Sequence, residues 1–120
     1  MGRAALAIVR LSGPAVETVA DVVLRPLRPG PWRSGKTRRV ALIDGDEVYD
    51  DGLAVFQRGP RSFTGEDTLE VTLHGNPLLV ERLVGACITA GAVLAEPGAF
   101  TRRAVLAGKL TLLGAEAVDL

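Results

Sequence analysis

The sequence predicts an α+β domain in which helices pack against a mixed β-sheet. Segments with apolar periodicity follow one another in the order strand, helix, strands, helix, strand. Residues 68–74 alternate strictly between apolar and polar side chains, which is typical of a strand with one buried face. Residues 44–46 read Asp-Gly-Asp between two further apolar runs, which predicts a hairpin turn.

The N-terminal half is expected to contain a buried strand, a helix and a hairpin. An apolar run over residues 4–11 ends at Ser-Gly-Pro and predicts the first strand. A helix is expected from Pro14 to about Leu27, because apolar residues recur there at helical spacing until Pro26 and Pro29 stop it. The remaining segments are a polar connector over residues 30–37 and strands over about 39–43 and 48–56.

The C-terminal half follows a loop over residues 57–67 and the alternating strand. Pro77 opens a helix whose inward face holds Leu79, Leu83, Ala86 and Ala90, and Gly91 ends it. A short strand is expected at 93–95, and Thr101 is expected to cap a short helix that Gly108 ends. A further helix is predicted from Leu112 onward. The predicted organisation is therefore a first domain over 1–111 and the start of a following helical domain over 112–120.

Bulk composition narrows the class of protein. The chain has 120 residues, enough for one domain with a real core. Lys plus Arg number 14 and Asp plus Glu also number 14, and this zero net charge argues against non-specific nucleic-acid binding. No apolar run approaches the roughly 18 residues of a membrane span, and no signal-peptide pattern is present. The single Cys87 is interpreted as a packing residue in a cytoplasmic protein.

Residues 30–37 spell the phosphate-loop pattern G-x-x-x-x-G-K-[ST], but their context argues against a nucleotide site. A phosphate loop needs a strand before it and a helix that begins at its Lys-Thr, so that amides at the helix start face the phosphates. Here a helix is expected before the string and a strand after it. Pro31 removes one amide and Trp32 adds bulk. We interpret the string as a basic surface connector.

Three charges in apolar surroundings are the candidate ligand-binding residues: Arg10, Glu70 and Lys109. A structural salt bridge is the alternative for each of them alone. Together they suit a ligand with hydrogen-bond donors at one end and negative charge at the other. A carboxylate accepts both donors of an amino-pyrimidinone ring, and Arg or Lys suits a carboxylate or phosphate.

The usual catalytic constellations are not expected in this sequence. His74 is the only histidine, and it is expected to face solvent or to cap the strand end. Glu66, Asp67 and Glu70 suggest at most a weak cation site, because the spaced oxygen ligands of a calcium loop are missing. We therefore predict neither a catalytic residue nor a metal site.

Three strings resemble the MnmE/TrmE family of tRNA modification GTPases. The first is GRAALAIVRLSGP over residues 2–14, and the second is SFTGEDTLE over residues 62–70, followed by His74 and Gly75. The third is PGAFTRRA over residues 97–104, followed by Gly-Lys-Leu and then Ala-Glu-Ala-Val. Their order and spacing run along the whole chain, so the combination is far more specific than any one of them.

The resemblance implies the N-terminal folate-binding domain of that family. Its fold is similar to the folate-binding domain of the glycine-cleavage aminomethyltransferase. Such a domain binds a tetrahydrofolate derivative, 5-formyl- or methylene-tetrahydrofolate, and forms a homodimer. With a flavin-dependent partner, the full protein modifies the wobble uridine of tRNA in the bacterial cytoplasm, and the GTPase domain lies elsewhere. By motif match, Arg10, Glu70 and Lys109 fall on folate-contacting positions, while Glu66 and Arg103 match motif residues of uncertain role.

The sequence also departs from the family pattern near its third motif. The usual polar or aromatic residues appear here as Ala99, Val105, Ala107 and Thr111. Because several of these positions surround Lys109, a divergent dimerisation or interaction module that has lost folate binding is the alternative. A stand-alone hydrolase that uses Glu66, Asp67 or His74 has less support.

Overall fold

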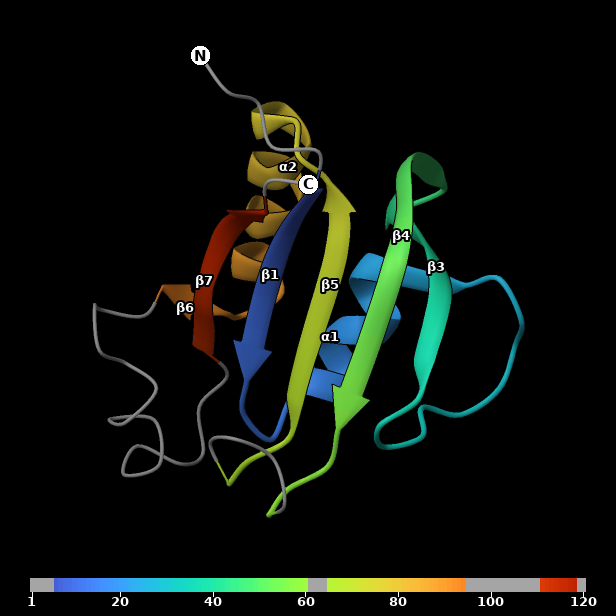
Figure 1. Cartoon of the computed structure of the whole chain (residues 1–120), viewed down its shortest axis with the longest axis vertical. Coiled ribbons are helices and arrows are strands. Elements are labelled where there is room, and N and C mark those ends of the chain that lie inside the picture. The colour runs from blue at the N-terminus through green and yellow to red at the C-terminus, as the bar shows by residue number, and fades with distance from the viewer. Residues whose placement is uncertain (1–5, 61–64, 95–110, 119–120) are drawn as a thin grey trace.

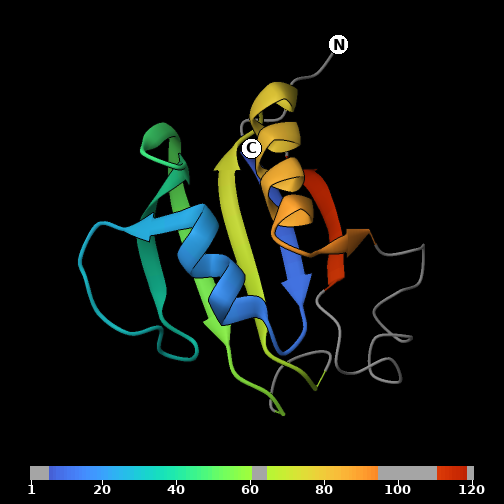
Figure 2. The same cartoon turned by 180° about the vertical axis from the view of Figure 1, so that it is seen from behind.

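The computed structural model describes residues 6–60, 65–94 and 111–118, which form one twisted sheet with both described helices on the same face (Figures 1 and 2). Within these ranges the sheet has seven strands in the order β2-β3-β4-β5-β1-β7-β6. Neighbouring strands are antiparallel except β6 and β7, which are parallel. The elements are β1 (Leu6–Ser12), α1 (Val16–Val23), β2 (Leu24–Pro26), β3 (Thr37–Asp44), β4 (Glu47–Gln57), β5 (Thr68–His74), α2 (Pro77–Thr89), β6 (Val93–Leu94) and β7 (Thr111–Val118). The predicted α+β class with a mixed sheet is confirmed.

The core lies between the sheet and the two helices. In β5 the apolar residues Leu69, Val71 and Leu73 are at most 1% exposed, and the polar residues between them point to the other face. The predicted alternation is thus confirmed. The large buried side chains come from both layers: Val9, Leu11, Val16, Val23, Val40, Leu42, Phe56 and Leu83. No described helix covers the opposite face of the sheet (Figure 1).

The predicted hairpin is confirmed, and its strands are longer than expected. Asp44 and Glu47 are register partners, so Gly45 and Asp46 form a two-residue turn. Gly45 has φ of 60°, a conformation that glycine adopts without steric cost and that type II′ hairpin turns require at this position.

The first helix is shorter than predicted. α1 ends at Val23, and Leu24 takes an extended conformation with φ −130° and ψ 152°. Residues Leu24–Pro26 then pair with β3 as β2. Leu24 has helical spacing, but it is buried as a strand residue, and Pro26 cannot continue a helix because its ring clashes with the preceding turn. Leu27 lies beyond the helix and is 54% exposed.

The second helix begins and ends where the sequence predicts. The Asn76 side chain accepts a hydrogen bond from the Leu78 backbone N–H at 2.8 Å, and Pro77 occupies the first turn. Gly91 follows with φ of 115°, as expected for a residue that ends a helix. Leu83 and Cys87 are fully buried, while Leu79, Ala86 and Ala90 pack against the core as partly buried residues.

The helix predicted from Leu112 is wrong. Residues Thr111–Val118 form β7, which pairs with β1 from Ser12 opposite Thr111 to Leu6 opposite Val118. Short apolar runs do not distinguish helix from strand, and here the unpaired backbone groups along one side of β1 select the strand. The domain boundary predicted at residue 111 therefore loses the helix on which it was based. The helix that Thr101 was expected to cap lies outside the described residues.

The described helices are also too short or too polar to cross a membrane.

Candidate functional site

Arg10 and Glu70 meet at the centre of the sheet. They are register partners on the antiparallel strands β1 and β5, and Arg10 Nε lies 2.9 Å from Glu70 Oε2. Their neighbours Val9 and Val71 are fully buried toward the helices, so the two charges project from the face that no described helix covers. The Arg10 side chain is 26% exposed and that of Glu70 is 46% exposed. Two of the three predicted site residues thus form one ion pair within reach of solvent.

Glu66 is held beside the end of β1. The Ser12 hydroxyl, whose residue is fully buried, donates a hydrogen bond to Glu66 Oε1 at 3.1 Å. The Gly13 backbone N–H donates to the Asp67 carbonyl oxygen at 2.9 Å. These bonds hold Glu66, which lies in the loop before β5, beside the end of the strand that carries Arg10. No role was predicted for Ser12, although the sequence places it before Gly-Pro at the end of a strand.

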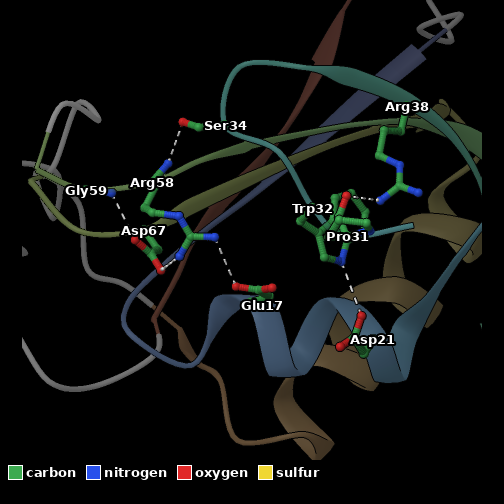
Figure 3. A network of polar contacts seen from close by, with 9 residues as sticks. All are labelled: Glu17, Asp21, Pro31, Trp32, Ser34, Arg38, Arg58, Gly59 and Asp67. Atoms are coloured by element: carbon green, nitrogen blue, oxygen red, sulfur yellow. Dashed lines mark hydrogen bonds and ion pairs between the residues drawn. The ribbon is translucent and has the colours of Figure 1, made fainter. Parts of the chain in front are cut away.

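The three carboxylates considered for a cation site do not converge on one point. Asp67 Oδ1 accepts from the Gly59 backbone N–H at 2.9 Å, and Asp67 Oδ2 lies 3.9 Å from Arg58 Nη1 (Figure 3). Asp67 therefore orders the loop after β4, while Glu70 pairs with Arg10. Among the described residues, no potential metal-binding group includes Glu66, Asp67 or Glu70.

The third predicted site residue, Lys109, lies outside the described residues, as do Arg103, Ala99 and Ala107. The backbone of β7 nevertheless shows where the chain returns to the sheet. Thr111 is the register partner of Ser12, which follows Arg10 by two positions on β1. The chain therefore rejoins the sheet beside Ser12, whose hydroxyl contacts Glu66.

The phosphate-loop string is a connector between strands. The helix expected before it is wrong, because the chain reaches the string from the short strand β2. The strand expected after it is confirmed, since Thr37 begins β3. No helix starts at Lys36, so the amides that would face a phosphate are missing. Trp32 is only 6% exposed, and its Nε1–H donates to Asp21 Oδ1 at 3.2 Å (Figure 3).

His74 lies at the end of β5, where its side chain is 62% exposed, as predicted. Its partner was not predicted: Asp50 Oδ1 lies 2.7 Å from His74 Nδ1, and Asp50 Oδ2 accepts from the His74 backbone N–H at 3.2 Å. The hydrogen bond to Asp50, together with the negative charge of that carboxylate, raises the pKa of His74 above its ordinary value.

A cavity of about 530 Å³ lies on the other face of the sheet, between α1, α2 and the β3–β4 hairpin. Its lining includes Val19, Ile43, Tyr49, Arg82 and Ala86. The Tyr49 hydroxyl is buried without a hydrogen-bond partner among the described residues, and burial raises the pKa of Tyr49 to about 12. The Arg82 guanidinium lies 4.4 Å from the centre of the Tyr49 ring. The cavity is separate from Arg10 and Glu70.

The family model and the individual relatives that match this chain identify the same family. Residues 1–109 match the family model described as the N-terminus of the GTP-binding protein TrmE. A tRNA modification GTPase MnmE from Roseiflexus castenholzii is 46% identical over 97% of this chain and 25% of the relative. The MnmE proteins of Chloroflexus aurantiacus (44% identical, 97% of this chain, 26% of the relative) and Xylella fastidiosa strain 9a5c (46%, 98% and 25%) are similar to the same extent. The chain spans about a quarter of the length of these relatives.

Proposed function

The chain belongs to the family of TrmE N-terminal domains, and on this basis we propose that it is the tetrahydrofolate-binding and dimerisation domain of a tRNA modification GTPase. The observation that carries the proposal is the Arg10–Glu70 pair on the face of the sheet that no described helix covers.

The chemistry of the pair fits the two ends of a reduced folate. Glu70 has one oxygen at Arg10 Nε, yet 46% of its side chain is exposed. A carboxylate in this position accepts both the ring N–H and the amino group of a pterin. Because the pair is partly exposed, turning Glu70 toward a ligand costs little of the pair's own stabilisation. The Arg10 guanidinium suits an anionic group of the same ligand.

Lys109 is the third residue of the proposed site, by its place in the third motif. It precedes Thr111 by two positions, and Thr111 pairs with Ser12 at the end of β1. One carboxylate and two cations then make up the proposed site.

Dimerisation is proposed for the face of the sheet that carries the pair. Leu53 and Val55 on β4 are partners of Thr72 and Glu70 on β5, and Leu53 is 43% exposed. Apolar side chains on an open sheet face favour contact with a second copy. In the full protein, the bound folate would supply a one-carbon unit for wobble-uridine modification of tRNA in the cytoplasm, together with a flavin-dependent partner.

A divergent module without folate is the second candidate, because Ala99, Ala107 and Thr111 replace polar family residues near Lys109. Thermal unfolding with and without 5-formyltetrahydrofolate distinguishes the two. Ligand at 100 times its dissociation constant adds about 2.7 kcal/mol to the free energy of unfolding. The second candidate predicts no shift in the melting temperature and a dimer by sedimentation.

Three variants locate the site within this experiment. Arg10→Gln and Glu70→Gln should each remove most of the folate-dependent shift, because each loses a charge-assisted hydrogen bond worth about 1.5–3 kcal/mol. Glu17→Gln is the matched control: its carboxylate is 42% exposed and lies 3.4 Å from Arg58, but on the helix face. A folate-dependent shift that survives in Glu70→Gln would refute the assignment of this residue.

A further inference from the structure

Asp50, Asp51 and His74 bring three potential metal ligands together on two internal strands, at the end of the sheet nearest the β3–β4 hairpin. The aspartates lie on β4, and His74 ends the neighbouring strand β5. One ligand atom from each residue lies within 4.8 Å of the other two. Of these three residues only His74 belongs to one of the family motifs, and the proposed folate site uses none of them.

The donor set is that of a divalent transition-metal site. An imidazole nitrogen and carboxylate oxygens are the ligands that Zn²⁺ takes together, at about 2.0–2.2 Å from the ion. Ligands at that distance around one tetrahedral ion are about 3.5 Å apart. The three ligand atoms are at most 4.8 Å apart, so they need to move by roughly one ångström to bind a single ion. His74 is 62% exposed and Asp51 is exposed, so side-chain rotation supplies this movement.

Asp50 provides a fixed point for the group. Its side chain is only 7% exposed, and the His74 backbone N–H and imidazole hold both of its oxygens. The Asp51 side chain, by contrast, has no hydrogen bond or ion pair with any residue that the structure describes. A bound cation would compensate the negative charge of both carboxylates, with Asp50 already held in place and Asp51 beside it.

The surrounding charge also favours a cation. Residues 44–51 include five acidic side chains and no Lys or Arg. In the described part of the chain, Arg82 approaches this segment, but it is paired with Asp44 and Glu47 rather than with the aspartates beside His74. The hairpin therefore keeps an excess of negative charge around the three ligands.

We propose that Asp50, Asp51 and His74 bind one divalent transition-metal ion, with Zn²⁺ as the best-matched ion. Three protein ligands leave at least one coordination position for water or a further ligand. This site is independent of the proposed folate site, which lies along β1 and β5 around Arg10 and Glu70.

Calorimetric titration of the chelator-treated chain with ZnCl₂ tests the proposal, with Co²⁺ absorption as a spectroscopic check on the ligands. We expect one ion per chain. His74→Gln and Asp51→Asn alter exposed residues and should each weaken Zn²⁺ binding by more than about tenfold. Because His74 is the only histidine, loss of its imidazole NMR signals on addition of Co²⁺ reports this residue alone.

Two controls make the result specific. Asp46→Asn lies on the same hairpin but outside the group, and Cys87→Ser removes the only thiol. Both should bind Zn²⁺ as the parent chain does. The proposal is overturned if the parent chain does not bind Zn²⁺ at millimolar concentration, if His74→Gln binds it equally well, or if Cys87→Ser abolishes binding. None of these readouts depends on folate.

Discussion

Replacement of Trp32 tests whether the phosphate-loop string is a structural anchor. Trp32 is 6% exposed, its ring centre lies 6.5 Å from that of Phe56, and the two rings are tilted by 50°. The Arg38 guanidinium lies 4.8 Å from the Trp32 ring centre and donates to the carbonyl oxygens of Gly30 and Pro31 at 3.1 and 3.3 Å. The middle of the string is thus packed onto the core rather than open to a ligand.

These contacts set the expected magnitude. Truncation of a buried Trp to Ala costs about 3–5 kcal/mol, through lost burial and the cavity left behind. The hydrogen bond from Trp32 to Asp21 adds at most about 1 kcal/mol, because Asp21 is exposed and is hydrated when the donor is removed. We therefore expect Trp32→Ala to lose about 4 kcal/mol of unfolding free energy. Trp32→Phe keeps an aromatic ring in place and should lose about 1–2 kcal/mol.

Urea unfolding followed by far-UV circular dichroism measures these differences, since the variants lack the only tryptophan that fluorescence would report. Lys36→Ala is the control: its side chain is exposed, and surface substitutions change stability by about 0.5 kcal/mol or less. A loss below 1 kcal/mol in Trp32→Ala would contradict the anchor role. So would GTP-dependent stabilisation of the parent chain that disappears in Lys36→Ala, because a true phosphate loop depends on that lysine.

Three further predictions concern single residues. Burial raises the pKa of Tyr49 from 10.0 to about 12, so the Tyr49 hydroxyl loses its proton at a lower pH in the unfolded chain than in the folded one. Stability should therefore fall as pH rises from about 10 to 12, by urea midpoints, and Tyr49→Phe should lack this component. Burial also raises the pKa of the Cys87 thiol to about 12, and this thiol should react with a disulfide reagent only after unfolding. Gly52→Ala would place its Cβ 2.1 Å from the Thr72 carbonyl oxygen and should lower the free energy of unfolding by about 3 kcal/mol. Gly85→Ala in α2 meets open space and should raise it by about 0.5–1 kcal/mol. Urea unfolding measures both changes.

Local patterns predicted the elements whose signals are short-range. The alternation in β5, the Gly45 turn, and the Asn76 and Gly91 ends of α2 all appear where expected. In each case the determining physics lies within a few residues: side-chain alternation, a positive φ, or a capping hydrogen bond. The same holds for the connector at residues 30–37, whose following strand was recognised correctly.

The secondary-structure predictions were wrong where strands distant in sequence determine the backbone conformation. Leu24 has helical spacing, but pairing with Leu42 makes it a strand residue. The run from Leu112 contains good helix formers, yet β1 offers it an unpaired row of backbone groups, and it becomes β7. Intrinsic helix propensity is a weak preference, and backbone pairing with a neighbouring strand outweighs it.

The candidate sites divide in the same way. The sequence by itself determined the family, through motifs spread along the chain, and it identified Arg10 and Glu70 as charges in apolar strands. Only the tertiary structure decided that these two are register partners 2.9 Å apart, that Ser12 holds Glu66, and that Asp50 and Asp51 lie beside His74. Residue types and spacing are local properties, whereas strand register is fixed by burial of a whole face, and register decides which distant side chains meet.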